Sequence, residues 1–266
     1  LRTLGARAEL ARLLVHAARR AYDQLAFERA SRLFAEALAL GVLGSEVERE
    51  ARTIAGECLV YDGQLPEATR SFVEASMLES DDTARSELLA RASHASANAL
   101  DLGSARRIAG EALTLLGARL PSSRLGLYLG ALGLLWGAFV ARPLRKLLPT
   151  RSPESAARLR ARHRVYLALQ FGAYLAGDSA LAIYSLMGML QVGLSLGPSV
   201  ERVESRGTAS VMYATLGLPR MAERATLDGR ADVEKVGGAR AQGKHAFFSA
   251  ITASKLGRYE EMERIV

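Results

Sequence analysis

Residues 59–75 read LVYDGQLPEATRSFVEA, and this stretch decides the fold that the sequence predicts. It indicates the end of one helix, a turn at Asp62-Gly63, and a second helix that carries Ala68, Phe72 and Ala75. Residues spaced by four and then three positions lie along one face of a helix. The same small, aromatic, small pattern occurs 38 residues earlier, at Ala30, Phe34 and Ala37. A recurring pattern of this kind predicts a repeated helical hairpin.

Similar hairpins are expected along most of the chain, and in several of them a turn glycine lies five residues before a packing position. Gly217 precedes Ala222 in this way, and Gly257 precedes Met262. The third hairpin carries Ala105, Ala109 and Ala112 and is expected to turn at Leu102-Gly103. The expected hairpins cover residues 8–40, 46–79, 83–117, 156–196, 200–235 and 239–266. One hairpin cannot bury its apolar face alone, so neighbouring hairpins are expected to stack.

The predicted fold is therefore an all-α superhelix of five or six helical hairpins. We expect N-terminal hairpins over 1–120, an atypical apolar helix and basic linker over 121–155, and C-terminal hairpins over 156–266. The chain has 266 residues, of which 49% are hydrophobic and 24% charged, so material for a continuous core is ample. Its single cysteine, Cys58, excludes a disulfide within the chain and is compatible with a reducing cytoplasm. The start at Leu1 and an end inside an expected helix predict a piece of a longer protein.

Residues 125–141, LGLYLGALGLLWGAFVA, are uncharged and lie between Arg124 and Arg142. One stripe of this expected helix consists of Leu125, Leu129, Leu132, Trp136 and Phe139, and the stripe beside it consists of Gly126, Gly130, Gly133 and Gly137. The run would be about 26 Å long, which is less than the ~30 Å hydrocarbon thickness of a bilayer. We predict a helix that buries its leucine stripe on adjacent repeats and brings its glycines against a close neighbour. A transmembrane segment, a membrane-surface contact and an oligomer contact are the alternatives.

A basic run follows directly. Residues 142–164 hold Arg142, Arg145, Lys146, Arg151, Arg158, Arg160, Arg162 and Arg164 against Glu154 alone. Eight minus one gives +7, which equals the net charge of the whole chain. Such a basic run can bind anionic lipid or nucleic acid through electrostatic attraction. A solvated linker, or a docking face for an acidic domain of a parent protein, is the favoured interpretation.

The candidate binding surface is a stripe on the first helices of the first three hairpins. Its members are Arg12, Arg19 and Tyr22; Glu50, Glu57 and Tyr61; and Glu87, His94 and Asn98. The three sets follow the hairpin period, so stacking aligns them into one surface, the usual binding surface of a repeat array. The alternative is an ordinary polar face.

Catalytic motifs are absent from the sequence. It contains no P-loop, no dinucleotide fingerprint, no HExxH and no GxSxG. The four histidines, His16, His94, His163 and His245, have no second ligand at metal-binding spacing. We therefore predict no catalytic, cofactor-binding or metal-binding residues.

The Gly-x4-Ala-x3-Phe-x2-Ala portion of the second hairpin resembles the tetratricopeptide repeat superfamily. The tryptophan and Leu-Gly that usually open such a repeat are absent, with Ala17-Ala18 and Ala55-Gly56 in their place. Four segments in order resemble the helical-repeat region of large bacterial signalling ATPases, kinases and cyclases: RRAYDQLAFERASRLFAEAL (19–38), LGARLPSSRLGLYLG (116–130), YSLMGMLQVGLSLGPSVER (184–202) and LGRYEEMERI (256–265).

These resemblances imply a non-catalytic interaction and regulatory region of a larger bacterial signalling protein, binding a protein or peptide on its concave face. The alternatives are a stand-alone adaptor, or a membrane-surface module that uses residues 125–141 and 142–164. Other domains of a parent chain and a second copy of this chain are further expected partners. Nucleic acid and membrane are less favoured.

Overall fold

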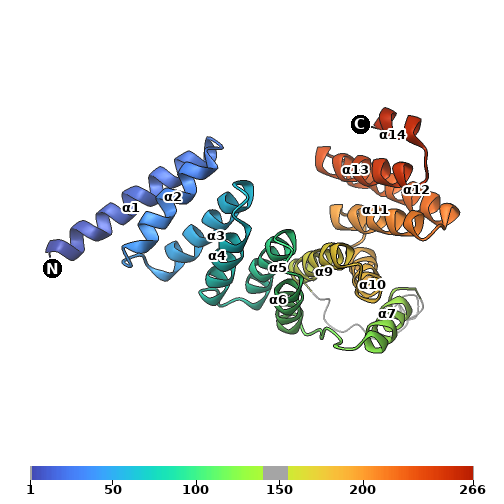
Figure 1. The fold of residues 1–266 in the computed structure, drawn as a ribbon, viewed down its shortest axis with the longest axis horizontal. Helices are drawn as coiled ribbons and strands as arrows, with labels where there is room; N and C mark the ends of the chain where they lie inside the picture. The colour runs from blue at the N-terminus through green and yellow to red at the C-terminus, as the bar shows by residue number, and fades with distance from the viewer. Residues whose placement is uncertain (1, 140–154, 266) are drawn as a thin grey trace. The chain divides into compact units, whose positions relative to one another are not determined.

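A computed structural model of the chain describes residues 2–139 and 155–265, and within these ranges the regular structure is helical, with no strand. The all-helical prediction is thus confirmed (Figure 1). In chain order the helices are α1 Arg2–Asp23, α2 Phe27–Ala39, α3 Ser45–Tyr61, α4 Leu65–Met77, α5 Asp82–Asn98, α6 Leu102–Leu115, α7 Arg124–Phe139, α9 Ala156–Ala176, α10 Ser179–Leu196, α11 Val200–Thr215, α12 Pro219–Val236, α13 Ala239–Lys255 and α14 Tyr259–Ile265.

The chain divides into two compact units. The first unit consists of Leu1–Leu120 and Phe171–Asp178, and the second of Pro121–Gln170 and Ser179–Val266. In the first unit α1 to α6 pack one against the next in chain order. In the second, α7 packs on α10, α10 on α11, α11 on both α12 and α13, and α13 on α14. The predicted division into 1–120, 121–155 and 156–266, and the superhelical arrangement, stay predictions.

The small and aromatic residues of the repeated pattern form the core of the first three hairpins, as predicted. Those of the first three hairpins are buried: Ala30, Phe34, Ala37, Ala68, Phe72, Ala75, Ala105, Ala109 and Ala112. Small residues at these places let the paired helices approach closely. A Cβ on Gly56 of α3, for example, would lie 2.8 Å from the Phe72 ring of α4. The pattern therefore sets the distance between the two helices of a hairpin.

The six hairpin turns within the described residues share one geometry. One residue of each turn has positive φ, and these residues are Leu25, Gly63, Leu100, Gly177, Gly217 and Gly257. The N–H of the following residue donates to a carbonyl five positions earlier, as Gln64 does to Leu59 at 2.9 Å, which is the Schellman helix ending. Each of these residues lies five positions before the packing residue that the sequence marked.

The predicted third turn at Leu102-Gly103 is wrong, because the positive-φ residue is Leu100 and Gly103 lies inside α6. The side chain of Asp101 accepts a hydrogen bond from the Ser104 N–H at 3.1 Å and so starts the helix before Gly103. A leucine occupies the position that glycine occupies elsewhere, so the glycine signal is misleading in this hairpin.

Replacing Leu100 with glycine is expected to stabilise the protein by about 0.5–1 kcal/mol. A non-glycine residue in the left-handed region is strained by ~1–2 kcal/mol, which glycine relieves. Glycine loses more conformational entropy on folding, and this reduces the gain by ~0.5–1 kcal/mol. Urea denaturation followed by circular dichroism measures the change. Gly63→Ala, at the equivalent turn (φ 77°), is the matched control and should lower the midpoint. A lower midpoint for Leu100→Gly would contradict the strain argument.

Helix α7 departs from the prediction on one face. Two of its four glycines meet close neighbours on α10: a Cβ on Gly130 would lie 2.9 Å from the Tyr184 ring and one on Gly137 would lie 2.6 Å from Gln191. Gly126 instead lies against Ser123 and Pro121, and Gly133 is exposed. The predicted burial of the leucine stripe is wrong: Leu125, Leu129, Leu132 and Trp136 are 59–69% exposed. The Phe139 side chain lies outside the described part. The side of α7 that packs on α10 carries Gly130 and Gly137, so the leucine stripe points away from α10.

Candidate functional site

The stripe predicted from the sequence brings together side chains from α1, α3 and α5. The Arg19 guanidinium of α1 donates to the Glu50 carboxylate of α3 at 2.6 Å. The Tyr22 hydroxyl of α1 donates to Oε2 of Glu57 at 2.7 Å, and Arg91 of α5 pairs with the other oxygen of Glu57. One carboxylate, that of Glu57, therefore links all three helices.

The charges on this face balance within the described residues. The predicted stripe together with Arg91 carries three arginines (Arg12, Arg19, Arg91) and three glutamates (Glu50, Glu57, Glu87), which gives a net charge of zero. The hydrogen bond to Glu57, with burial, raises the pKa of Tyr22 to about 12, so the phenol stays protonated near neutral pH. Burial and then Glu57 raise the pKa of the neighbouring Cys58 to about 11, so its thiol is a poor nucleophile at pH 7.

Three aromatic rings form what we call the aromatic platform: Tyr22, Phe27 and Tyr61. Phe27, the first residue of α2, stacks on Tyr61, the last residue of α3, with ring centroids 4.4 Å apart and planes at 17°. Tyr22 meets Phe27 edge-on at 5.9 Å. Tyr61 is exposed. The platform thus offers an aromatic surface to a ligand beside the hydrogen-bonded Glu57.

The stripe continues onto α5. Asn98 donates from Nδ2 to the His94 carbonyl at 2.9 Å and lies 3.2 Å from His94 Nδ1. The exposed His94 ring lies against Phe171, with centroids 4.8 Å apart. Glu87 is half-buried on α5, and Arg12 is exposed on α1. Sequence reasoning missed Phe27 and Phe171, although the position of Phe27 immediately after a turn is a usable signal.

The predicted basic patch is only partly described. Arg142, Arg145, Lys146 and Arg151 lie outside the described residues, whereas Arg158, Arg160, Arg162 and Arg164 belong to α9. Residues two apart on a helix point about 200° away from each other, so these four divide between two sides of α9. Arg160 lies 3.7 Å from Glu201 of α11. The α9 arginines therefore do not form one continuous face.

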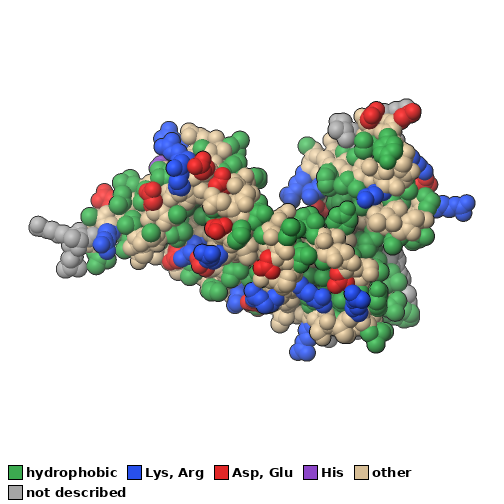
Figure 2. Space-filling model, in the orientation of Figure 1, with side chains coloured by type: hydrophobic (Ala, Val, Ile, Leu, Met, Phe, Trp, Pro, Cys, Tyr) green, Lys and Arg blue, Asp and Glu red, His purple; other side chains and the backbone are tan. Residues whose placement is uncertain are grey.

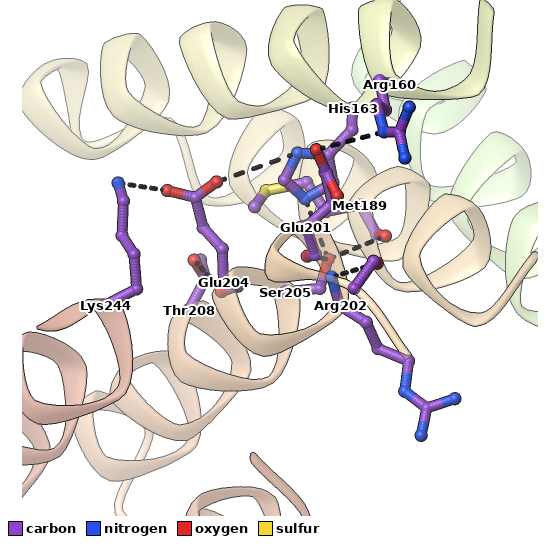
Figure 3. Close-up of polar contacts among 10 residues, drawn as sticks. Arg160, His163, Met189, Glu201, Arg202, Glu204, Ser205, Thr208 and Lys244 are labelled. Atoms are coloured by element: carbon purple, nitrogen blue, oxygen red, sulfur yellow. Dashed lines mark hydrogen bonds and ion pairs between the residues drawn. The ribbon is translucent and has the colours of Figure 1, made fainter. Parts of the chain in front are cut away.

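A second polar cluster, missed by the sequence analysis, lies inside the second unit (Figure 3). His163 of α9 lies with Nδ1 3.9 Å from the Glu204 carboxylate of α11, and Lys244 of α13 donates to the same carboxylate at 2.5 Å. His163 Nε2 is 3.0 Å from the Ser205 hydroxyl. Glu204 and Lys244 are 40 residues apart, one repeat period, and this spacing was the available signal.

The order serine, histidine, carboxylate resembles a hydrolase triad, but the geometry does not support one. The Ser205 hydroxyl donates a hydrogen bond to the Glu201 carbonyl at 2.7 Å, so its proton is directed away from His163, unlike that of a catalytic nucleophile. The 3.9 Å separation of His163 and Glu204 is too long for a hydrogen bond. Ser205 and His163 are each 1% exposed, so no substrate reaches them. The cluster ties α9, α11 and α13 together.

Buried His163 is expected to make stability fall as the pH falls. Burial lowers its pKa below 6.5, and the nearby Glu204 and Glu201 oppose this shift only in part. Below about pH 6.5 His163 therefore binds a proton in the unfolded chain but not in the folded chain. The free energy of unfolding is highest above about pH 6.5 and decreases below it. Unfolding midpoints between pH 8 and pH 5 should decline less for His163→Gln than for wild type. His16→Gln, at an exposed position on α1, is the control and should follow the wild-type curve.

Among the residues that the structure describes, no three His, Cys, Asp or Glu side chains are grouped as metal ligands. Helix α10 alone among the described helices has the length and apolar composition of a membrane span, and 61% of it is buried within the protein, as in a core helix. No protein-family model, curated protein or solved structure matches this chain.

Proposed function

We propose that this chain is a non-catalytic, tetratricopeptide-like repeat region that binds a protein or peptide on the face formed by α1, α3 and α5. The observation that supports the proposal most is the shared surface of three successive first helices, joined through Glu57 to Tyr22 and Arg91. Repeat arrays generally use such a surface for binding.

The chemistry of the face favours a ligand held by aromatic and hydrogen-bonding contacts. Glu50 and Glu57 are already paired with arginines, so little unbalanced charge is left for a charged ligand. The exposed Tyr61 ring on the aromatic platform is suited to an apolar or aromatic anchor residue. Exposed His94 and Asn98 supply hydrogen-bonding groups further along the same face. Affinity for such a peptide should depend only weakly on salt.

By resemblance, the region belongs to a bacterial cytoplasmic signalling protein and relays ligand binding to an attached ATPase, kinase or cyclase. The alternative is a stand-alone adaptor with the same binding face. The sequence that flanks this chain in its gene distinguishes the two, because a P-loop or kinase motifs beside it support the first.

Peptide selection tests the binding face. A displayed random-peptide library is selected on the immobilised protein, and the affinities of enriched peptides are measured by calorimetry. Tyr61→Ala should weaken binding by about 10-fold or more, the usual loss at an aromatic interface anchor. Met77→Ala, at an exposed apolar residue on α4, is the control and should leave affinity unchanged. Peptides that bind Tyr61→Ala and wild type equally would overturn the assignment of this face.

A further inference from the structure

Helix α7 presents an apolar surface that no described residue of the second unit covers. Its exposed residues recur at the spacing of one helical face: Leu125, Tyr128, Leu129, Leu132, Leu135 and Trp136, which we call the α7 stripe. In Figure 2, hydrophobic side chains gather over the α7 end of the view, at the lower right. A helix that is apolar on all sides is normally buried, and large exposed apolar patches mark interaction sites.

The opposite side of α7 is fixed to α10. Leu127 and Ala131 are buried, and Gly130 and Gly137 lie against Tyr184 and Gln191. A helix held this closely along one side is not free to turn its stripe inward. The stripe therefore faces outward while α7 stays seated on α10.

Charge favours an anionic surface as the occupant. Exposed Arg124 begins α7, one turn before Tyr128. By sequence, residues 142–164 carry a net charge of +7 shortly after the helix. Positive charge at the start of α7 and in the sequence that follows it attracts anionic lipid headgroups, whereas it does not favour the pairing of two identical copies.

The aromatic residues favour the same occupant. Tyr128 and Trp136 both belong to the α7 stripe and both are exposed. Tyrosine and tryptophan are enriched where a protein meets the headgroup level of a bilayer, because one end of each ring system is apolar and the other forms hydrogen bonds.

We propose that the α7 stripe binds the surface of a membrane rich in anionic lipid, with α7 lying in the plane of that surface. The 16 residues of α7 extend about 24 Å, less than the ~30 Å of a hydrocarbon core, and α10 covers one side of the helix. The helix therefore lies on the membrane rather than crossing it. The α7 stripe is separate from the peptide-binding face, so this inference does not depend on the proposed function.

Trp136 is the single tryptophan of the chain and reports directly on the stripe. The purified chain is mixed with phosphatidylcholine vesicles that contain or lack phosphatidylserine, and both Trp136 emission and co-sedimentation are recorded. Vesicles with phosphatidylserine should shift the emission to the blue and sediment the protein, and added salt should weaken both effects.

Two variants locate the contact. The double change Leu129→Glu and Leu132→Glu should lower vesicle partitioning by roughly 100-fold or more, and Arg124→Gln by about 5-fold. Leu227→Glu makes the same chemical change at an exposed leucine on α12 and should partition as wild type does. Circular dichroism checks that all variants keep the wild-type helicity.

Three results would overturn the proposal. The first is Trp136 emission that does not respond to phosphatidylserine vesicles. The second is equal partitioning of the Leu129→Glu, Leu132→Glu variant and wild type. The third is a dimer in sedimentation velocity without lipid that the same variant dissociates, which would assign the α7 stripe to a second copy of the chain.

Discussion

Arg202→Met is expected to lower the free energy of unfolding by about 3–5 kcal/mol, because it leaves a buried carboxylate without its partner. Asp232 of α12 is 2% exposed. Arg202 of α11 donates from Nε to Oδ2 of Asp232 at 2.7 Å and pairs through Nη2 with Oδ1. Without the guanidinium, the carboxyl group must take up a proton or draw water into the contact between the two helices.

The double variant Arg202→Met, Asp232→Leu should recover most of that loss, since it removes both charges together. Urea denaturation and amide hydrogen exchange in α11 and α12 measure the single and double variants, and their difference gives the coupling energy of the pair. Arg224→Met is the control. Arg224 pairs with Asp228 at 3.3 Å but its side chain is exposed, so this substitution should change the free energy of unfolding by no more than about 0.5 kcal/mol. Equal losses for Arg202→Met and Arg224→Met would contradict the burial argument.

The sequence was sufficient for the hairpins because their signals are local. Ala68, Phe72 and Ala75 lie within two helical turns of one another, and a glycine of positive φ precedes them at Gly63. The expected hairpins over 156–196 and 200–235 agree with the observed helices to within a residue. Local periodicity therefore predicted which segments form helices and, in the first three hairpins, which face of the second helix is buried.

Features that depend on strain or on distant partners were not predictable in the same way. Leu25 and Leu100 adopt positive φ without being glycine, so no residue type marks those turns. The exposed stripe of α7 has the same composition as a core helix, and composition alone cannot show that α10 covers only the side with Gly130 and Gly137. Whether an apolar face is buried is decided by the neighbours that are present.

The candidate binding site was predictable in part. The hairpin period aligned Arg19 with Glu57, and the structure joins both residues to other members of the stripe. The contact of Phe171 with His94 was not predictable from local patterns, because the two residues are 77 positions apart in the sequence. The cluster of His163, Glu204 and Lys244 carried a periodic signal that becomes readable only once side-chain directions are known.

Gly207→Ala is expected to destabilise the second unit by about 1–3 kcal/mol, because it overpacks the contact between α11 and α13. A Cβ at Gly207 would lie 2.5 Å from Cγ of Phe248, closer than carbon atoms in proteins approach. The Phe248 ring is itself packed edge-on against Phe247, with centroids 5.2 Å apart, so its movement disturbs a second ring. This loss should outweigh the ~1 kcal/mol that alanine gains over glycine inside a helix.

Gly243→Ala is the matched control, on α13. No atom lies within 4 Å of a Cβ built there, so the helix-propensity gain should appear alone, as a stabilisation of about 0.5–1 kcal/mol. The same substitution in neighbouring helices thus has opposite predicted signs, which urea denaturation of both variants measures directly. Amide exchange in α11 and α13 should become faster in Gly207→Ala and slower in Gly243→Ala. If both variants are more stable than wild type, α11 and α13 lie further apart than the contact of Gly207 with Phe248 requires.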